Sequence, residues 1–252
     1  MTFLVQQPIL WFLMVLLLLY FASLLGEFVQ KHRTGPLMND DKEFDLVVGA
    51  TLTLLGLIIG FTFSMAVTRY DQRKNLEEAE ANAIGTEYVR ADLLPSADAA
   101  KVRTLLRDYT DQRILYYTSR GEERLQQINA NVAQLQSNLW SSVTSANTVR
   151  DPVTALVLSG MNDVLNSQGY TEAAWRNRVP VAAWTLLIII AFFCNLLLGL
   201  RGEQHSFRLL WILPIALAVS FFLIADIDSP RHGVIRVVPQ NLESLADSLR
   251  PH

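Results

Sequence analysis

The sequence GLIIGFTFSMAVTRYDQRKNLEEAEANAIG, residues 56–85, changes from apolar to charged without a helix breaker. Residues 56–68 contain no ionisable side chain, whereas charges are frequent from Arg69 onward, and no proline interrupts the stretch. A charge at the centre of a bilayer costs about 2.5–3.5 kcal/mol, so the first part suits lipid and the second part suits water. The stretch therefore predicts one helix that leaves a membrane and continues into a charged region.

The rest of the chain has a membrane composition. Of its 252 residues 51% are hydrophobic and 18% are charged, and the charged residues gather between long apolar runs. A hydrocarbon core of about 30 Å needs about 20 apolar helical residues, and four runs are long enough. These runs cover residues 9–29, 46–68, 179–200 and 207–227. No lysine or arginine precedes the first run, so we expect a retained anchor rather than a cleaved signal peptide.

The runs divide the chain into four parts. Residues 1–68 hold transmembrane helices one and two with a polar loop, and residues 69–178 form a soluble domain. Residues 179–227 hold transmembrane helices three and four, and residues 228–252 form a C-terminal tail. Near the membrane, eight lysines and arginines lie on the side of the soluble domain and five on the other side. Because cytoplasmic loops are richer in these residues, we expect the domain and both termini in the cytoplasm.

The soluble domain has the periodicity of amphipathic helices. Apolar residues recur at steps of three and four between positions 121 and 143, which places them on one helix face. They are Leu125, Ile128, Val132, Leu135, Leu139 and Val143. The same pattern occurs in residues 97–117, where Ser96 is the expected N-cap. Its members are Val102, Leu105, Tyr109 and Tyr116.

A third helix is expected over residues 152–168, with Asp151 as its cap and Pro152 at its first position. No alternating pattern of useful length predicts a strand. The stripe at 125–143 is too short for a coiled-coil rod, so a compact bundle is favoured, with two of its helices continuous with membrane runs two and three. The fold class is thus an all-α membrane protein, with four transmembrane helices and a helical domain between the second and third.

The sequence carries no motif for enzyme chemistry or nucleic-acid binding. It has no phosphate-binding glycine loop, no nucleophile elbow, no zinc-protease motif and no basic tract. Its one cysteine, Cys194, lies in an apolar run, so a disulfide within the chain is impossible. The four histidines fall in separate polar segments, at His32, His205, His232 and His252. We therefore expect no enzyme activity, no metal, no cofactor and no nucleic-acid partner.

An acidic cluster follows the second run, at Glu77, Glu78 and Glu80. Carboxylates at this spacing could serve acid–base chemistry or bind a cation. The favoured interpretation is a solvated helix face, because Arg73 and Lys74 each lie four residues before a glutamate.

The second membrane run has two distinct faces. One is a row of small residues at Gly56, Gly60 and Ser64, and such a row lets another helix approach closely. The other is a ladder of bulky apolar residues at Leu54, Ile58, Phe61 and Met65. Either the ladder faces lipid, or copies of the helix surround an axis and the ladder forms a hydrophobic constriction.

Short motifs lie within and directly after the second run, and others follow the fourth run. Gly60-Phe61 is followed by Tyr70-Asp71-Gln72-Arg73 and Glu77. After the fourth run the chain reads Asp226-Ile227-Asp228-Ser229-Pro230-Arg231-His232-Gly233, and then Asn241-Leu242 and Leu245. In these motifs and in its order of elements the chain resembles bestrophin ion channels. As a whole it looks most like the bacterial bestrophin-like membrane proteins. It departs from bestrophins at Lys74 and Asn75, which stand in place of two tryptophans, and its tail lacks a full calcium clasp.

The resemblance implies an oligomeric ion channel, with a pentamer as the expected assembly, in a bacterial inner membrane. Its partners would be copies of itself, the lipid bilayer and small inorganic ions. The ladder would form the neck of the pore, and Arg69, Arg73 and Glu77 would carry the charges at its mouth. Asp228, Pro230 and Gly233 would fold a turn directly after the fourth membrane helix.

A second class of function fits the same sequence. The chain could be a membrane-anchored sensor or scaffold whose helical domain binds a ligand or a protein. A sensor would place residues 69–178 outside the cell, whereas the distribution of lysine and arginine favours the cytoplasm.

Overall fold

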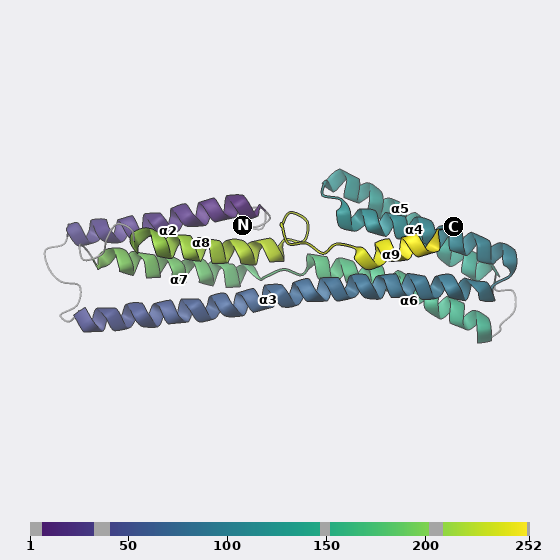
Figure 1. The fold of residues 1–252 in the computed structure, drawn as a ribbon, viewed down its shortest axis with the longest axis horizontal. Helices are drawn as coiled ribbons and strands as arrows, with labels where there is room; N and C mark the ends of the chain where they lie inside the picture. The colour runs from purple at the N-terminus through teal and green to yellow at the C-terminus, as the bar shows by residue number, and fades with distance from the viewer. Residues whose placement is uncertain (1–6, 33–40, 147–151, 202–208, 251–252) are drawn as a thin grey trace. The chain divides into compact units, whose positions relative to one another are not determined.

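The computed structural model describes residues 7–32, 41–146, 152–201 and 209–250, which are helical almost throughout and contain no strand (Figure 1). The elements are α2 (Pro8–Lys31), α3 (Asp41–Arg90), the 3-10 helix η1 (Ala91–Leu93), α4 (Ser96–Thr118), α5 (Glu122–Ala146), α6 (Pro152–Arg176), α7 (Val181–Leu200), α8 (Leu209–Asp228) and α9 (Gln240–Leu249). Four of the helical stretches are long and apolar enough to cross a membrane, and they include α2, α7, α8 and the first part of α3. The predicted fold class, an all-α membrane protein, is confirmed.

The chain forms two compact units. The membrane unit consists of Met1–Arg69 and Arg178–Ile235, and the bundle unit consists of Tyr70–Asn177 and Arg236–His252. Helix α3 supplies its apolar part to the first unit and its charged part to the second. The C-terminal helix α9 belongs to the bundle unit, where it packs against α4.

In the membrane unit, α2 packs against both α7 and α8. Its closest approach to α7 is at two glycines. A Cβ atom on Gly26 would lie 2.2 Å from the Leu196 carbonyl oxygen, and one on Gly199 would lie 2.1 Å from the Ser23 carbonyl oxygen. Since both obstacles are backbone atoms, the two helices can cross this closely only where the side chain is a hydrogen.

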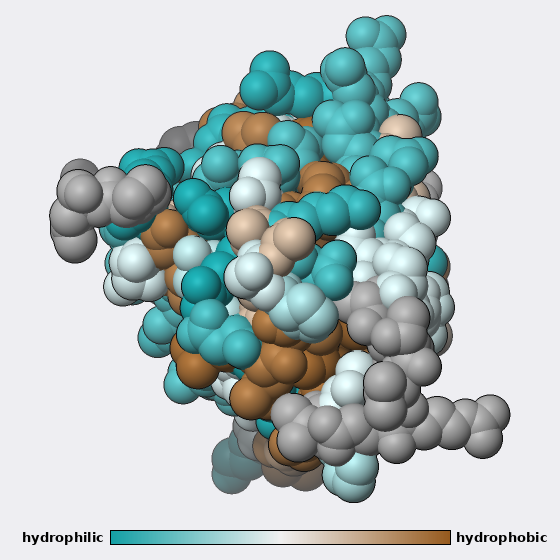
Figure 2. Space-filling view, turned by 90° about the vertical axis from the view of Figure 1, so that its right-hand side faces the viewer, coloured by the Kyte–Doolittle hydropathy of each residue, from teal (hydrophilic) through white to brown (hydrophobic). Residues whose placement is uncertain are grey.

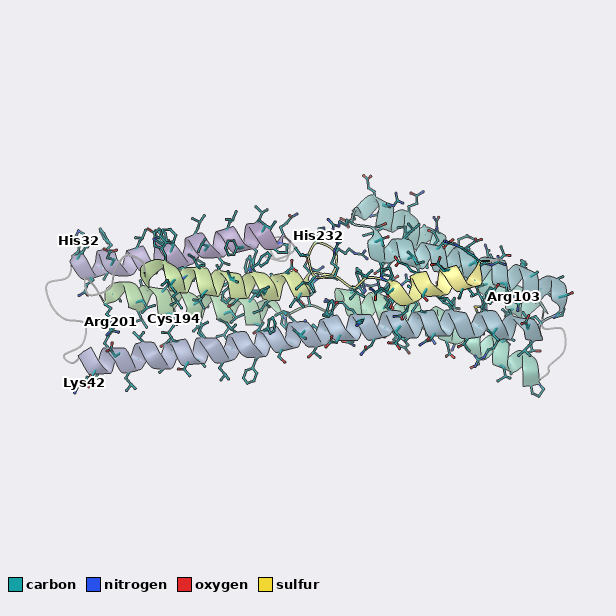
Figure 3. The ribbon with its side chains drawn as sticks, in the orientation of Figure 1. His32, Lys42, Arg103, Cys194, Arg201 and His232 are labelled. Atoms are coloured by element: carbon teal, nitrogen blue, oxygen red, sulfur yellow. The ribbon has the colours of Figure 1, made fainter. Side chains whose placement is uncertain are left out.

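A charged contact lies at the end of α7. Arg201 Nη1 lies 2.7 Å from Oδ1 of Asp45, which belongs to the first turns of α3. Arg201 is labelled in Figure 3. Both side chains are partly exposed, so the pair contributes about 0–1 kcal/mol and mainly fixes geometry.

The bundle unit has one hydrophobic core, to which α3, α4, α5, α6 and α9 contribute. The apolar stripe predicted on α5 is confirmed, because its members Ile128, Val132, Leu139 and Val143 are buried and Leu125 and Leu135 pack against the core. The stripe predicted on α4 is confirmed in the same way. The face drawn in Figure 2 is largely hydrophilic, with a smaller hydrophobic patch, as is usual for a surface that meets water.

Two local predictions are wrong. The third membrane helix is not continuous with the bundle, because α6 ends at Arg176 and α7 begins at Val181, with Pro180 as its N-cap. A proline disfavours helical geometry in the residue before it, so the chain leaves the helix at 177–180. Ser96 does not cap α4 either, since Pro95 holds that position and no side chain bonds the helix start. Asp151, His205 and His252 lie outside the described residues.

The glycine crossing gives a first test. Gly26→Ala should lower the thermal unfolding midpoint of the purified protein by several degrees, because a methyl group there overlaps backbone atoms and overpacking costs about 1–3 kcal/mol. Gly169→Ala, within helix α6, is the matched control, since a Cβ atom at Gly169 meets nothing within 4 Å. Equal midpoints for the two variants would show that the crossing does not limit stability.

Candidate pore-lining helix

The apolar part of α3 buries one narrow face in its own chain. The buried residues are Val48, Leu55, Thr62 and Ala66, with exposures of 5%, 1%, 4% and 0%. At 100° per residue they point in one direction within about 20°. The Thr62 hydroxyl donates to the Ile58 carbonyl at 2.8 Å, so this polar side chain is satisfied within the helix.

The predicted ladder lies on a second face, about 95° around the helix from the buried face. Leu54, Phe61 and Met65 are 47%, 64% and 40% exposed, and Ile58 is half-buried. The described part of the chain therefore leaves most of this bulky apolar face uncovered.

The small-residue row is a third face, about 130° from the ladder on its other side. Gly56, Gly60 and Ser64 are all exposed. A Cβ atom on Gly56 or Gly60 would meet nothing within 4 Å, so no described helix of the same chain packs on this row. In the most apolar 18-residue window of α3, 17% of the residues are buried, against 50% in α8. Of the four spans, α3 is the least covered.

The three charges predicted at the pore mouth lie in different surroundings. Arg69 is in the membrane unit, 16% exposed, with its Nη1 atom 3.9 Å from Asp228 Oδ1. Arg73 is in the bundle unit, 1% exposed, and donates from Nε to the Ala174 carbonyl at 3.3 Å and from Nη2 to the Asn177 carbonyl at 3.1 Å. These carbonyls lie in the last turn of α6 and directly after it, so Arg73 caps the C-terminal end of that helix.

Glu77 is also buried within the bundle unit. Its carboxylate accepts hydrogen bonds from Asn241 Nδ2 at 2.6 Å and from the Leu242 backbone N–H at 2.9 Å. The first N–H groups of a helix have no partner within it, and a carboxylate there also favours the positive end of the helix dipole. Glu77 therefore holds the start of α9 in the bundle.

The expectation of a solvated acidic face is wrong for Glu77 and Glu80, which are 1% and 0% exposed. Glu80 pairs with the buried Arg113 and accepts hydrogen bonds from Tyr117 Oη at 3.2 Å and Thr171 Oγ1 at 3.1 Å. Burial would lower the pKa of Arg113, but the adjacent Glu80 carboxylate raises it above its ordinary value. Burial raises the pKa of Tyr117, and the Glu80 charge adds to this, so the phenol stays neutral.

The predicted tail turn follows α8 directly. Asp228 accepts the Val179 N–H at 3.0 Å and 3.1 Å through its two oxygens, and Pro230 is buried. A Cβ atom on Gly233 would lie 2.3 Å from the Asp226 carbonyl oxygen, so close packing requires glycine here. Asp226, the first residue of the tail motif, for which the sequence predicted no separate role, accepts the Val234 and Ile235 N–H groups at 2.7 Å and 2.8 Å.

Comparison with known families decides the affiliation of this arrangement. The family described as "Bestrophin-like domain" matches residues 16–242, nearly the whole chain. The chain belongs to the Bestrophin-like family. The resemblance drawn from the sequence is thereby confirmed, and the chain is a channel-like integral membrane protein. No curated protein matches it.

Solved structures share the fold of this bestrophin-like chain. Crystal structures of two point mutants of a bacterial bestrophin homologue from Klebsiella pneumoniae each have 16% identity and a TM-score of 0.65. Each comparison covers 94% of this chain and 97% of the other. A crystal structure described as a membrane protein has 16% identity, a TM-score of 0.61 and the same coverage. At this identity the likeness shows the fold.

The burial of three ionisable residues on α3 of this bestrophin-like chain could have been predicted from their spacing in the sequence. Arg73, Glu77 and Glu80 follow one another at steps of four and three, on the same side of α3 as the buried Thr62 and Ala66. The helical period that places Thr62 and Ala66 on one face, continued past residue 68, would therefore have predicted that these three side chains are buried. The partners Arg113 and Asn241 gave no comparable signal, because they lie far away in the sequence.

The Glu77 contact gives a second test. Glu77→Ala should expose α9, because the Leu242 N–H and the Asn241 side chain lose a buried acceptor, at a cost of about 1–3 kcal/mol. Hydrogen exchange of residues 240–249 should become faster by about fivefold to 100-fold, as 1.4 kcal/mol corresponds to a factor of ten. Glu78→Ala, at an exposed position one residue away, should leave the exchange unchanged. Equal protection in both variants would exclude Glu77 as the anchor of α9.

Proposed function

We propose that the chain is the subunit of an oligomeric channel for small inorganic ions, in which copies of α3 surround an axis. The observation that carries the proposal is the division of α3 into three faces. One face, at Leu55 and Thr62, is buried in its own chain, whereas the described residues leave most of the ladder and the small-residue row uncovered. Membership of the Bestrophin-like family supports the same arrangement.

In this proposal Leu54, Ile58, Phe61 and Met65 meet their symmetry copies and form a hydrophobic neck. Apolar walls cannot replace the hydrogen bonds of water, so a narrow neck of this kind empties of water. An ion in it then faces a desolvation barrier of several kcal/mol. Conduction is passive, and the wetting of the neck sets its rate.

The small-residue row supplies the contact between subunits. The open space at Gly56 and Gly60 admits a neighbouring helix to within close van der Waals distance. The expected assembly is a closed ring, with five subunits by resemblance to bestrophins. The ring would lie in a bacterial inner membrane, with both termini and the bundle unit in the cytoplasm.

In this proposal Arg69, directly after the apolar part of α3, is the charged residue nearest to the neck. Arg73 and Glu77 act differently from the sequence-based expectation of charges that line the mouth, because both are 1% exposed. Their effect on ions would come through the electrostatic potential, and not through contact.

The neck gives a third test, in vesicles reconstituted with the purified oligomer. Ile58→Ala combined with Phe61→Ala should raise ion flux severalfold, because smaller walls admit water and lower the barrier, and it should change the sign preference little. Phe63→Ala is the matched control, since Phe63 is exposed on the opposite side of α3 and should leave flux at the wild-type level.

A lipid-facing ladder would leave the flux of the double variant at the background of empty vesicles. Absence of flux from wild type and variant alike, in a properly assembled oligomer, would exclude conduction and favour the membrane-anchored sensor or scaffold.

The row gives a fourth test. Gly60→Leu should dissociate the oligomer in detergent, because a large side chain blocks the approach of the neighbouring subunit. Mass measurement of the purified particle checks this. Gly121→Leu, at a position in the α4–α5 connection where a Cβ atom also meets nothing within 4 Å, should leave the mass unchanged. If Gly60→Leu keeps the mass of the wild type, the row is not a subunit contact.

A further inference from the structure

Glu87 is a buried acid in the last turn of α3, within the bundle unit. Its side chain is fully buried, and neither carboxyl oxygen has a hydrogen-bond partner among the described residues. Glu77 and Glu80, the other buried glutamates described on this helix, each accept several hydrogen bonds. Glu87 therefore differs from them in that no described residue donates a hydrogen bond to its carboxyl group.

Helix α6 lies directly on this carboxyl group. A Cβ atom on Gly160 would lie 2.0 Å from Glu87 Oε2 and 2.4 Å from Arg90 Nη1. The absence of a side chain at Gly160 thus creates the space that the carboxyl group occupies. A methyl group would have to push it aside, which is possible because a carboxyl at the end of a side chain can move.

The charges around Glu87 are few. Arg90 on α3 is a cation nearby, and Asp163 on α6 is an anion whose side chain is exposed. On α4, Arg103, labelled in Figure 3, is already paired with Asp92 of η1, and its Nε donates to the Tyr88 carbonyl at 3.5 Å. Arg90 is thus the group that can oppose a negative charge on Glu87.

Burial of an ionised carboxylate without hydrogen bonds is costly, so such a group takes up a proton instead. Burial raises the pKa of Glu87 to about 8, with Arg90 lowering it and Asp163 raising it further. At neutral pH the neutral form is therefore the main form.

We propose that Glu87 is a proton-binding site at the contact of α3 with α6, which the neutral carboxyl group occupies and the carboxylate leaves. The neutral carboxyl group fits over Gly160 without a partner. The carboxylate needs donors, so on losing its proton it turns toward Arg90 or water, and the contact with α6 loosens. The proposal is independent of ion conduction.

The direction of the pH effect on stability follows from the same shift. Because the pKa of the folded state is raised from 4.5 to about 8, the folded chain binds this proton more tightly than the unfolded chain. The contribution to stability is fully present below pH 4.5 and is lost as the pH rises through about 8.

The test is an infrared pH titration of the full chain in lipid nanodiscs, in which a protonated carboxyl and a carboxylate absorb separately. The wild-type protein should show one carboxyl group that ionises near pH 8, and Glu87→Gln should lack it. Gly160→Ala should move the midpoint down by one pH unit or more, because the carboxyl group is displaced toward water. Arg90→Gln should move it up, because the opposing cation is gone. Glu78→Gln, at an exposed position, should keep the wild-type step.

The proposal is overturned if no carboxyl group ionises near pH 8, or if the step survives in Glu87→Gln. It is overturned as well if Gly160→Ala and Arg90→Gln both leave the midpoint in place. A Glu87 carboxyl group that ionises near its ordinary value of 4.5 would also overturn the proposal, because the folded chain would then stabilise the carboxylate as well as water does.

Discussion

One face of α3 meets the helices of its own chain over almost the full length of the helix, and the rest of the structure depends on this register. Nine buried positions follow at steps of three, four and seven: Val48, Leu55, Thr62, Ala66, Arg73, Glu77, Glu80, Ile84 and Glu87. Ala81, next to Glu80, is buried as well. In the membrane unit these residues are apolar, except Thr62, whose hydroxyl donates a hydrogen bond within the helix. In the bundle unit most of them are ionisable. The helix continues because its spacing is unchanged; only the chemistry of the buried face changes at the edge of the apolar run.

The ionisable part of this face organises the bundle unit, because each buried charge requires a partner. Arg73 donates hydrogen bonds to carbonyls at the end of α6, and Glu77 accepts one from a backbone N–H at the start of α9. Glu80 forms an ion pair with Arg113 of α4. Removing one member of a buried ion pair costs about 3–5 kcal/mol, far more than a surface pair contributes. The break between α6 and α7 is stabilised similarly, since Asp228 accepts the N–H of Val179 just before α7.

The sequence predicted what depends on local pattern. The four membrane runs follow from length and hydropathy, and the α5 stripe follows from its period, because both signals lie within about 20 residues. The sequence did not predict the buried charged contacts, because these depend on partners that are distant in the chain. Glu77 looked like the partner of Arg73 in an i,i+4 surface pair, and Glu80 looked like part of the same solvated face, because Asn241 and Arg113 are remote in sequence. Gly26 and Gly199 were not singled out, since periodicity does not tell which glycine of an apolar helix meets another backbone.

The angles between the faces of α3 carry the proposed assembly one step further. In a closed ring, the direction from one helix to its nearest copy makes an acute angle with the direction to the axis. If the ladder points to the axis, the small-residue row lies at about 130° from that direction and therefore points outward. The buried face, at about 95° on the other side, points sideways, nearly perpendicular to the direction of the axis. Gly56 and Gly60 would then receive the outer helices of a neighbouring subunit, and not its α3, so that each α3 is wedged between its own chain and the next. That wedge leaves the bulky ladder as the face that narrows the pore.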